Sequence, residues 1–212
     1  MPAWIVTGID TDVGKTLVSS ILTEMLCGEY WKPIEAGGRD TETVQGWIEC
    51  PIHPPAYRFQ NPLSPHHAAA LEGREIEEAY LQLPKTDSPL IVEGVGGILA
   101  PLRQDLLFGD LLLEWNAPCV VVVRFYLGSL NHTLLTLSWL KEREIPIAGL
   151  IFNGKAYPEG EELLLRYSSL PCLGKISWEP YLNRRKIQWY AKQFLPLWEE
   201  IFNLSGTPLS NG

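Results

Sequence analysis

No hydrophobic run in this sequence approaches the roughly 18 consecutive apolar residues that a membrane-spanning helix requires. The first apolar run begins at Ala3 and predicts a strand so close to the start of the chain that no signal peptide fits before it. These two absences predict a cytoplasmic protein with no membrane partner.

Positive charge is also scarce. The chain has 17 Lys and Arg residues against 25 Asp and Glu, which gives a formal net charge of −8. A nucleic-acid-binding surface needs basic side chains clustered on one face, so we expect no nucleic-acid partner. An anionic small molecule must then be held by local positive groups, because the overall field repels it.

Cysteine is rare and dispersed. The four cysteines form no C-x-x-C pair, so we expect small buried hydrophobic residues instead of a metal centre or a disulfide framework. With 212 residues, 46% of them apolar and 20% charged, the composition is that of an ordinary globular protein. The prediction is one domain over residues 1–204, followed by a disordered tail over residues 205–212.

The most informative stretch is residues 8–16, G-I-D-T-D-V-G-K-T, which follows an apolar strand and precedes apolar residues at helical spacing. Strand, glycine-rich turn and helix together predict a phosphate-binding loop, in which backbone N–H groups and the positive end of the helix face a polyphosphate. Lys15 is expected to reach the β- and γ-phosphates, and the Thr16 hydroxyl to bind Mg²⁺. Five residues separate Gly8 from Gly14, where the strict pattern has four, and Ile9 occupies the place of the usual glycine.

The rest of the chain alternates between strand and helix patterns. Further strands are expected over residues 30–34, 89–93, 118–123 and 147–153, with a weaker one over 173–176. Helices are expected from an N-cap at Asp40, from Ser64-Pro65, and over residues 133–144 and 182–202. Prolines recur between residues 50 and 65, which predicts an irregular loop. The tryptophans near the end of the chain are expected to pack the terminal helix: Trp178, Trp189 and Trp198.

This alternation predicts an α/β fold, doubly wound, with a mostly parallel sheet and helices on both of its faces. Ligands of such sheets bind at the carboxyl ends of the strands. The residues with chemical potential stand at those ends, which predicts one composite active site that includes Gly8, Lys32, Glu93, Gly128 and Asn153.

Five motifs occur in the order in which they stand in a known family: residues 8–16, K-P-I-E-A-G at 32–37, S-P-H at 64–66, V-E-G-V-G-G at 92–97 and L-G-S-L-N-H at 127–132. They resemble the dethiobiotin synthetases, an ATP-dependent family of P-loop NTPase type. The resemblance extends from residue 3 to about residue 153. It implies a homodimer with a shared active site that binds 7,8-diaminopelargonate, CO₂ and MgATP. The carbamate of one amine would be phosphorylated by ATP, and the second amine would then close a cyclic urea.

The resemblance also implies roles for particular residues. Lys15 and Lys32 would be catalytic, and Thr16, Asp40 and Glu93 would bind Mg²⁺. ATP would be bound by Asp12, Val13, Gly14, Lys15, Thr16, Leu17, Glu93, Gly94, Val95, Gly96 and Asn153. The diamine would be bound by Thr11, Lys32, Ala36 and Gly96 of one subunit, and by Gly128 and Asn131 of the neighbouring subunit.

Three positions depart from the family pattern. Ala36 replaces a hydroxyl residue, the loop before Asp40 is shortened so that Glu42 is an alternative metal ligand, and Ser177 replaces proline in a G-x-I-P motif. Asn131 has an alternative role as the N-cap of its helix. For the whole chain, the alternative is a dimeric ATPase switch of the septum- and chromosome-positioning type, although such proteins carry an additional lysine early in the phosphate loop. An amidotransferase-linked ligase would need a further domain.

Overall fold

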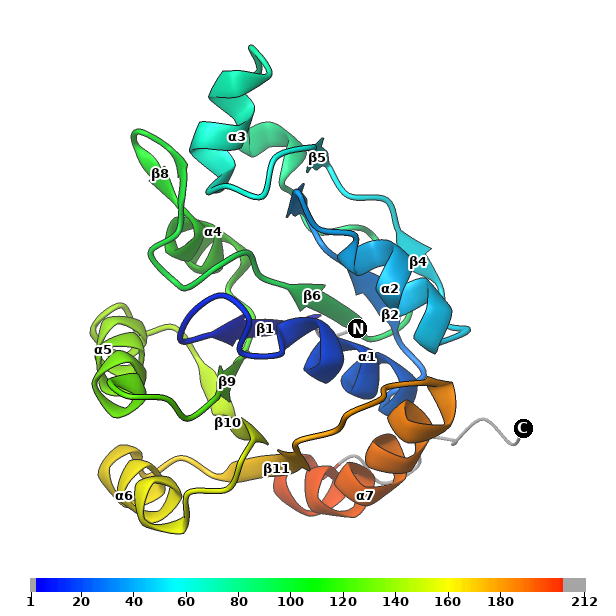
Figure 1. The fold of residues 1–212 in the computed structure, drawn as a ribbon, viewed down its shortest axis with the longest axis vertical. Coiled ribbons are helices and arrows are strands. Elements are labelled where there is room, and N and C mark those ends of the chain that lie inside the picture. The colour runs from blue at the N-terminus through cyan, green and yellow to red at the C-terminus, as the bar shows by residue number, and fades with distance from the viewer. Residues whose placement is uncertain (1–2, 204–212) are drawn as a thin grey trace.

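Seven parallel strands form the central sheet of the protein (Figure 1). The computed structural model describes residues 3–203, so the tail predicted from Ser205 lies outside the described residues. The strand order β11-β10-β9-β1-β6-β2-β4 places β1 at the centre, between β6 and β9. The bounds are β1 Ala3–Gly8, β2 Glu29–Trp31, β4 Ile52–His53, β6 Leu90–Glu93, β9 Cys119–Val123, β10 Ile147–Gly154 and β11 Cys172–Ser177.

Seven α-helices accompany the sheet in the described part of the chain: α1 Lys15–Met25, α2 Asp40–Trp47, α3 Pro65–Leu71, α4 Phe108–Trp115, α5 Ser129–Glu142, α6 Pro158–Ser168 and α7 Arg184–Phe202. Helices α1, α2 and α7 contact one another, and α5 contacts both α4 and α6. Figure 1 shows these two groups on opposite sides of the strands. The predicted doubly wound, parallel α/β fold is therefore confirmed.

The core follows from the apolar runs that predicted the strands. All five residues of β9 are buried, as expected for a strand covered on both faces. On one side of the sheet, Trp4 of β1 makes edge-to-face contacts with Trp198 and Phe202 of α7. The terminal helix is thus fixed to the central strand by aromatic packing. The Asn183 side chain accepts a hydrogen bond from the Lys186 N–H (3.0 Å) and caps this helix.

Several predicted boundaries were wrong. The strand expected over residues 30–34 is divided into β2 and β3 (Ile34–Ala36), because Pro33 has no N–H with which to continue the ladder. The loop expected over residues 50–65 contains two short strands, β4 and β5 (Tyr57–Phe59), and β5 pairs with β3. A second small sheet joins β7 (Pro101–Arg103) to β8 (Leu106–Leu107), and a 3₁₀ turn covers Glu78–Tyr80.

Two helix starts also differ from the prediction. Helix α5 begins at Ser129, four residues before the expected start, because Gly128 adopts φ +97° and turns the chain directly into the helix. Asn131 is therefore the third helical residue and not the N-cap. Helix α2 has Arg39 at its N-cap position, so the N-cap predicted at Asp40 is one residue too late. Neither cap position supplies a side-chain hydrogen bond.

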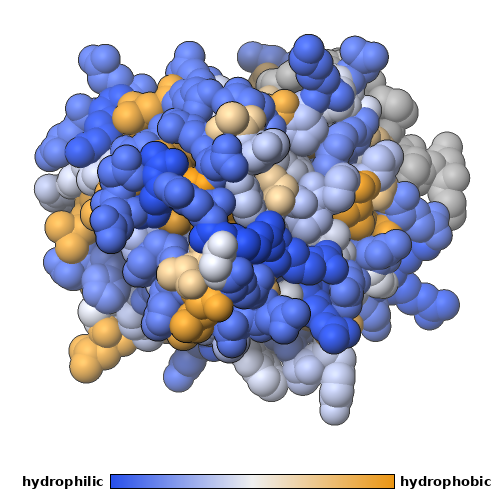
Figure 2. All heavy atoms as spheres, turned by 90° about the horizontal axis from the view of Figure 1, so that it is seen from above, coloured by the Kyte–Doolittle hydropathy of each residue, from blue (hydrophilic) through white to orange (hydrophobic). Residues whose placement is uncertain are grey.

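The surface seen from above carries its hydrophobic side chains in separate patches between hydrophilic ones (Figure 2). Among residues 3–203, no helix has the length and apolar character that crossing a membrane would need. None of the four cysteines forms a disulfide within this part of the chain, and Cys119 alone is fully buried, so the expectation of buried cysteines holds for one of the four.

Candidate active site

A cleft of about 990 Å³ opens at the carboxyl ends of the central strands. It collects residues from the loops after β1, β2, β6 and β10, which are the strand ends singled out in the sequence. The predicted site residues that line it are Thr11, Asp12, Gly14, Lys15, Thr16, Leu17, Lys32, Ala36, Asp40, Glu93, Val95, Gly96 and Asn153. A parallel sheet brings these positions together although they are up to 142 residues apart, from Thr11 to Asn153.

The loop between β1 and α1 is shaped by Gly14. This residue has φ +102° and stands at the N-cap of α1. A Cβ added there would lie 2.1 Å from Nδ2 of Asn153, which itself donates a hydrogen bond to the carbonyl oxygen of Val13 (2.8 Å). Glycine is required by both the backbone angle and the neighbour. The loop thereby directs the N-terminus of α1, with its partial positive charge, into the cleft.

Lys15 is buried at the start of α1, and its Nζ donates a hydrogen bond to the carbonyl oxygen of Asp10 (2.8 Å). Burial lowers the pKa of Lys15 from 10.5 to about 8; the nearby Glu93 carboxylate opposes this shift, and the ammonium of Lys32 adds to it. An anion bound in the loop would supply the charge partner that this ammonium lacks.

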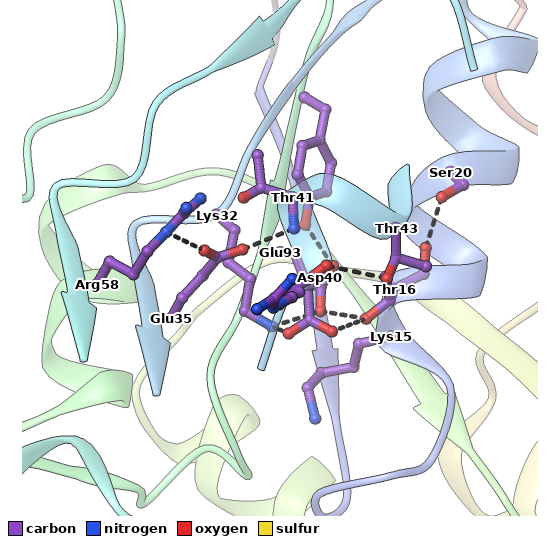
Figure 3. Close-up of polar contacts among 12 residues, drawn as sticks. Lys15, Thr16, Ser20, Lys32, Glu35, Asp40, Thr41, Thr43, Arg58 and Glu93 are labelled. Carbon is purple, nitrogen blue, oxygen red and sulfur yellow. Dashed lines mark hydrogen bonds and ion pairs between the residues drawn. The ribbon is translucent and has the colours of Figure 1, made fainter. Parts of the chain in front are cut away.

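A second buried lysine is held by two carboxylates. Nζ of Lys32 pairs with Oε1 of Glu93 (2.8 Å) and with Oδ2 of Asp40, and Figure 3 shows the three side chains converging. Burial by itself would lower the pKa of Lys32, but Glu93 and Asp40 outweigh it and raise that pKa above its ordinary value. Lys32 is therefore a permanently charged group at the end of β2.

The same two carboxylates accept hydrogen bonds from the Thr16 hydroxyl, at 2.8 Å for Glu93 and 3.2 Å for Asp40. The other oxygen of Glu93 accepts from the Tyr30 hydroxyl (2.7 Å); burial and the Glu93 charge raise the pKa of Tyr30 well above its usual value. Glu93 is thus fixed from three sides. Tyr30, which the sequence did not single out, orients it from within the core.

Thr16, Asp40 and Glu93 offer hydroxyl and carboxylate oxygens of the kind that Mg²⁺ prefers. Among the described residues, no group of three or more His, Cys, Asp or Glu side chains is arranged to hold a metal, because here the third oxygen belongs to a threonine. Glu42, the alternative ligand, forms ion pairs with Arg39 (3.4 Å) and Arg58 (3.5 Å). The donor set that faces the cleft therefore contains Asp40.

Four predicted site residues do not line the cleft. Val13 and Gly94 are buried beneath it. Gly128 and Asn131 are exposed at the N-terminus of α5. The single chain brings the phosphate loop, Lys32 and Glu93 together, but it leaves these two residues outside.

The sequence reasoning missed part of the lining. Arg124, directly after β9, donates a hydrogen bond to the carbonyl oxygen of Asp12 (3.0 Å) and so supports the phosphate loop. Trp178, expected to pack the terminal helix, instead lines the cleft with 68% of its surface exposed, and Trp189 is also exposed. Only Trp198 packs as predicted. The position of Arg124 after an apolar strand was a usable signal; Trp178 had none.

A parallel α/β sheet with a glycine-containing phosphate loop at the N-terminus of its first helix defines a P-loop nucleotide-binding protein. In agreement, residues 3–186 match a family described as an AAA domain. The chain belongs to the ATP-dependent dethiobiotin synthetases. It is 42% identical over 209 residues to ATP-dependent dethiobiotin synthetase BioD of Chlamydia abortus, a match that covers 97% of this chain and 98% of that protein. It is 40% identical over 206 residues to the BioD of Cytophaga hutchinsonii, covering 94% and 100%.

Solved structures with the same fold are more distant in sequence. The septum site-determining protein MinD of Pyrococcus horikoshii, complexed with Mg-ADP, aligns with a TM-score of 0.57 at 16% identity and covers 96% of this chain and 98% of that one. A plasmid partition protein of Borrelia burgdorferi bound to AMPPNP also gives 0.57, at 13% identity and 95% and 97% coverage. These likenesses show the fold alone. The alternative function as an ATPase switch has no support beyond it, whereas the sequence relatives are synthetases.

Proposed function

We propose that this protein catalyses the ATP-dependent closure of the ureido ring of dethiobiotin. An amine of 7,8-diaminopelargonate adds to CO₂ to form a carbamate, and a carbamate oxygen attacks the γ-phosphorus of ATP and expels ADP. The second amine then attacks the carbonyl carbon of the mixed anhydride and expels phosphate. The observation that carries the proposal is the presence of two buried lysines, Lys15 and Lys32, in one cleft with a phosphate loop.

The phosphate loop is assigned to ATP. The backbone N–H groups at the start of α1 and the Lys15 ammonium would hold the β- and γ-phosphates, where the lysine gains the charge partner that its burial calls for. Asn153, which is already fixed beside Gly14, stands where the adenine would extend from the phosphates. Asp12, Val13 and Leu17 complete the loop, and Gly94, Val95 and Gly96 form the opposite wall.

The oxygens of Thr16, Asp40 and Glu93 are assigned to Mg²⁺. A bound Mg²⁺ would supply Lewis-acid neutralisation of phosphate oxygens in the transferred group. The three side chains are already within hydrogen-bond distance of one another, so they need little rearrangement to share a ligand. Tyr30 keeps Glu93 in place, because its hydroxyl donates to the carboxylate oxygen that faces the core.

Lys32 is assigned to the carbamate and the γ-phosphate. Phosphoryl transfer depends mostly on positioning and on positive groups where negative charge develops. A lysine that stays protonated and enters the cleft from the end of β2 suits this role. Thr11, Ala36 and Gly96 would then contact the diamine between the two lysines.

The test is chemical. Purified protein with diaminopelargonate, bicarbonate and MgATP should release one ADP per cyclic urea formed, with the product identified by mass spectrometry. Omission of the diamine should reduce ADP release to a small fraction of the full rate. If ATP is consumed equally fast without diamine, the protein is not this synthetase and the ATPase-switch alternative gains.

We further propose that the active form is a homodimer in which Gly128 and Asn131 reach the site of the neighbouring subunit. Both residues are exposed at the N-terminus of a helix, a position suited to a carboxylate, yet they lie outside the cleft of their own chain. The adjacent Leu127 is fully exposed, as a side chain that enters a partner would be.

Mixing of two inactive variants tests this arrangement. Lys15→Ala and Asn131→Ala subunits that exchange should form heterodimers with one intact site, and activity should return to about half of one dimer's capacity. If subunit exchange is verified but no activity returns, Asn131 does not act in trans.

A further inference from the structure

Glu35 carries a fully buried carboxylate that the proposed chemistry does not use. It lies in the short strand β3, three residues after Lys32. Its Oε1 accepts a hydrogen bond from the backbone N–H of Thr41 (2.6 Å). Its Oε2 is 2.9 Å from Nε of Arg58, an ion pair outside hydrogen-bond geometry. Figure 3 shows this chain of contacts next to Asp40.

A buried carboxylate is costly unless its partners compensate for the lost hydration. Arg58 compensates only in part, because its side chain is 51% exposed. The contact with Thr41 is of another kind, since it joins the carboxylate to the first turn of helix α2, where backbone N–H groups have no partner within the helix. A negative charge at this end is also favoured by the helix dipole.

Helix α2 needs such an anchor. It has eight residues, and its N-cap residue, Arg39, provides no side-chain hydrogen bond. Two glycines, Gly37 and Gly38, precede that residue and restrict the backbone very little. A helix this short is marginal without external contacts. Glu35 supplies the missing cap from a neighbouring strand.

We infer that Glu35 is a positioning residue for the metal ligand Asp40. Asp40 is the first residue of α2 and directly precedes Thr41, so the Glu35–Thr41 hydrogen bond fixes the turn from which the Asp40 carboxylate reaches Thr16. Glu35 touches neither substrate nor metal. It sets the distance between Asp40 and the rest of the oxygen donors. This inference depends on the proposed assignment of Asp40 to Mg²⁺.

The experiment measures metal binding without turnover. Mn²⁺ is titrated into the protein saturated with ADP, and free Mn²⁺ is followed by electron paramagnetic resonance; ADP affinity is measured separately in EDTA. Because Glu35→Ala leaves an unpaired N–H in the core, two milder changes are compared, with folding checked by thermal unfolding. Glu35→Asp keeps the charge but withdraws the oxygen from Thr41, whereas Glu35→Gln keeps an acceptor at the same length.

Glu35→Asp should weaken Mn²⁺ binding about tenfold, the size of loss expected for a hydrogen bond to a buried charged group. Glu35→Gln should change it by less than about threefold, since the acceptor remains. Affinity for metal-free ADP should stay within about twofold in both, because the Lys15 loop is untouched. The matched control is Glu42→Gln, which removes a charge from the same helix that pairs with the same Arg58, and it should leave Mn²⁺ binding unchanged.

Two results would overturn the inference: Mn²⁺ affinity of Glu35→Asp within threefold of the wild type, or a parallel loss of ADP affinity, which would mean a general structural role. A larger loss in Glu35→Gln than in Glu35→Asp would assign the effect to charge pairing with Arg58 and would also overturn it. Asp40→Asn separates the inference from its premise. If that variant binds Mn²⁺ as the wild type does, the proposed metal site itself is wrong.

Discussion

Gly14→Ala is the substitution whose effect can be worked out most completely from the structure. The new Cβ would lie 2.1 Å from Nδ2 and 3.0 Å from Cγ of Asn153, which is far inside van der Waals contact. Alanine at φ +102° is strained by on the order of 1–3 kcal/mol. Displacement of Asn153 also breaks its hydrogen bond to Val13, which adds about 1 kcal/mol.

These costs fall on the closed phosphate loop, so they reduce nucleotide affinity. Their sum of about 2–4 kcal/mol corresponds to a loss of about 30- to 700-fold in ADP affinity. Isothermal titration calorimetry measures it. Gly46→Ala is the matched control, because Gly46 lies in helix α2 with no atom within 4 Å of an added Cβ. It should leave ADP binding unchanged and favour the helix slightly.

A double-mutant cycle with Asn153→Ala separates the two costs. If the clash contributes, Gly14→Ala should cost less in the Asn153→Ala background, and the remaining loss reports the backbone strain. A loss of less than about fivefold in the single Gly14→Ala variant would refute the reasoning, since neither the angle nor the contact would then matter to the loop.

Three further predictions concern the lysines and the core. Because burial lowers the pKa of Lys15 to about 8, the free lysine loses its proton as the pH rises through 8, and phosphate binding restores that proton. ADP binding should therefore take up about 0.7 proton at pH 8.5 and about 0.1 at pH 7, and affinity should fall above pH 8; calorimetry in buffers of different ionisation enthalpy measures this, and zero uptake at pH 8.5 contradicts it. Lys15→Ala and Lys32→Ala should each reduce single-turnover rates about a hundredfold or more, and a loss below about fivefold would remove that lysine from the mechanism. Trp198→Ala should lower the free energy of unfolding by about 3–5 kcal/mol in urea titrations, because its fully buried ring packs on Trp4 and its Nε1 donates to the Leu173 carbonyl oxygen (3.0 Å); a change below about 1 kcal/mol would show that the core relaxes around it.

The parallel sheet could be predicted because its strands are short continuous apolar runs. The Cys119–Val123 strand has one interpretation at that length, and the carboxyl ends of such strands must meet. The convergence of Thr16, Lys32 and Glu93 followed from this rule without any knowledge of side-chain geometry. Each of these residues stands at, or directly after, a recognisable element.

Other parts of the structure could not be predicted for physical reasons. Helix α4 is mostly apolar, and three of its eight residues are leucines, so a helical period is hard to separate from a buried strand. Trp178 enters the lining of the cleft through a loop whose course depends on where α7 docks. The cap of α2 comes from Glu35, outside the helix and across two glycines, whereas sequence rules look for a cap at the residue just before the helix.

The ion pairs of Lys32 imply that this lysine is the counterion of the ligand-free cleft. Asp40 and Glu93 would repel each other if they faced the same hydroxyl without a balancing charge. Lys32 can release them only when another cation takes its place, so filling of the cleft is an exchange of one cation for another. The Lys32→Ala variant therefore lacks more than an ammonium for the reacting groups: its two carboxylates are left unbalanced before any ligand arrives.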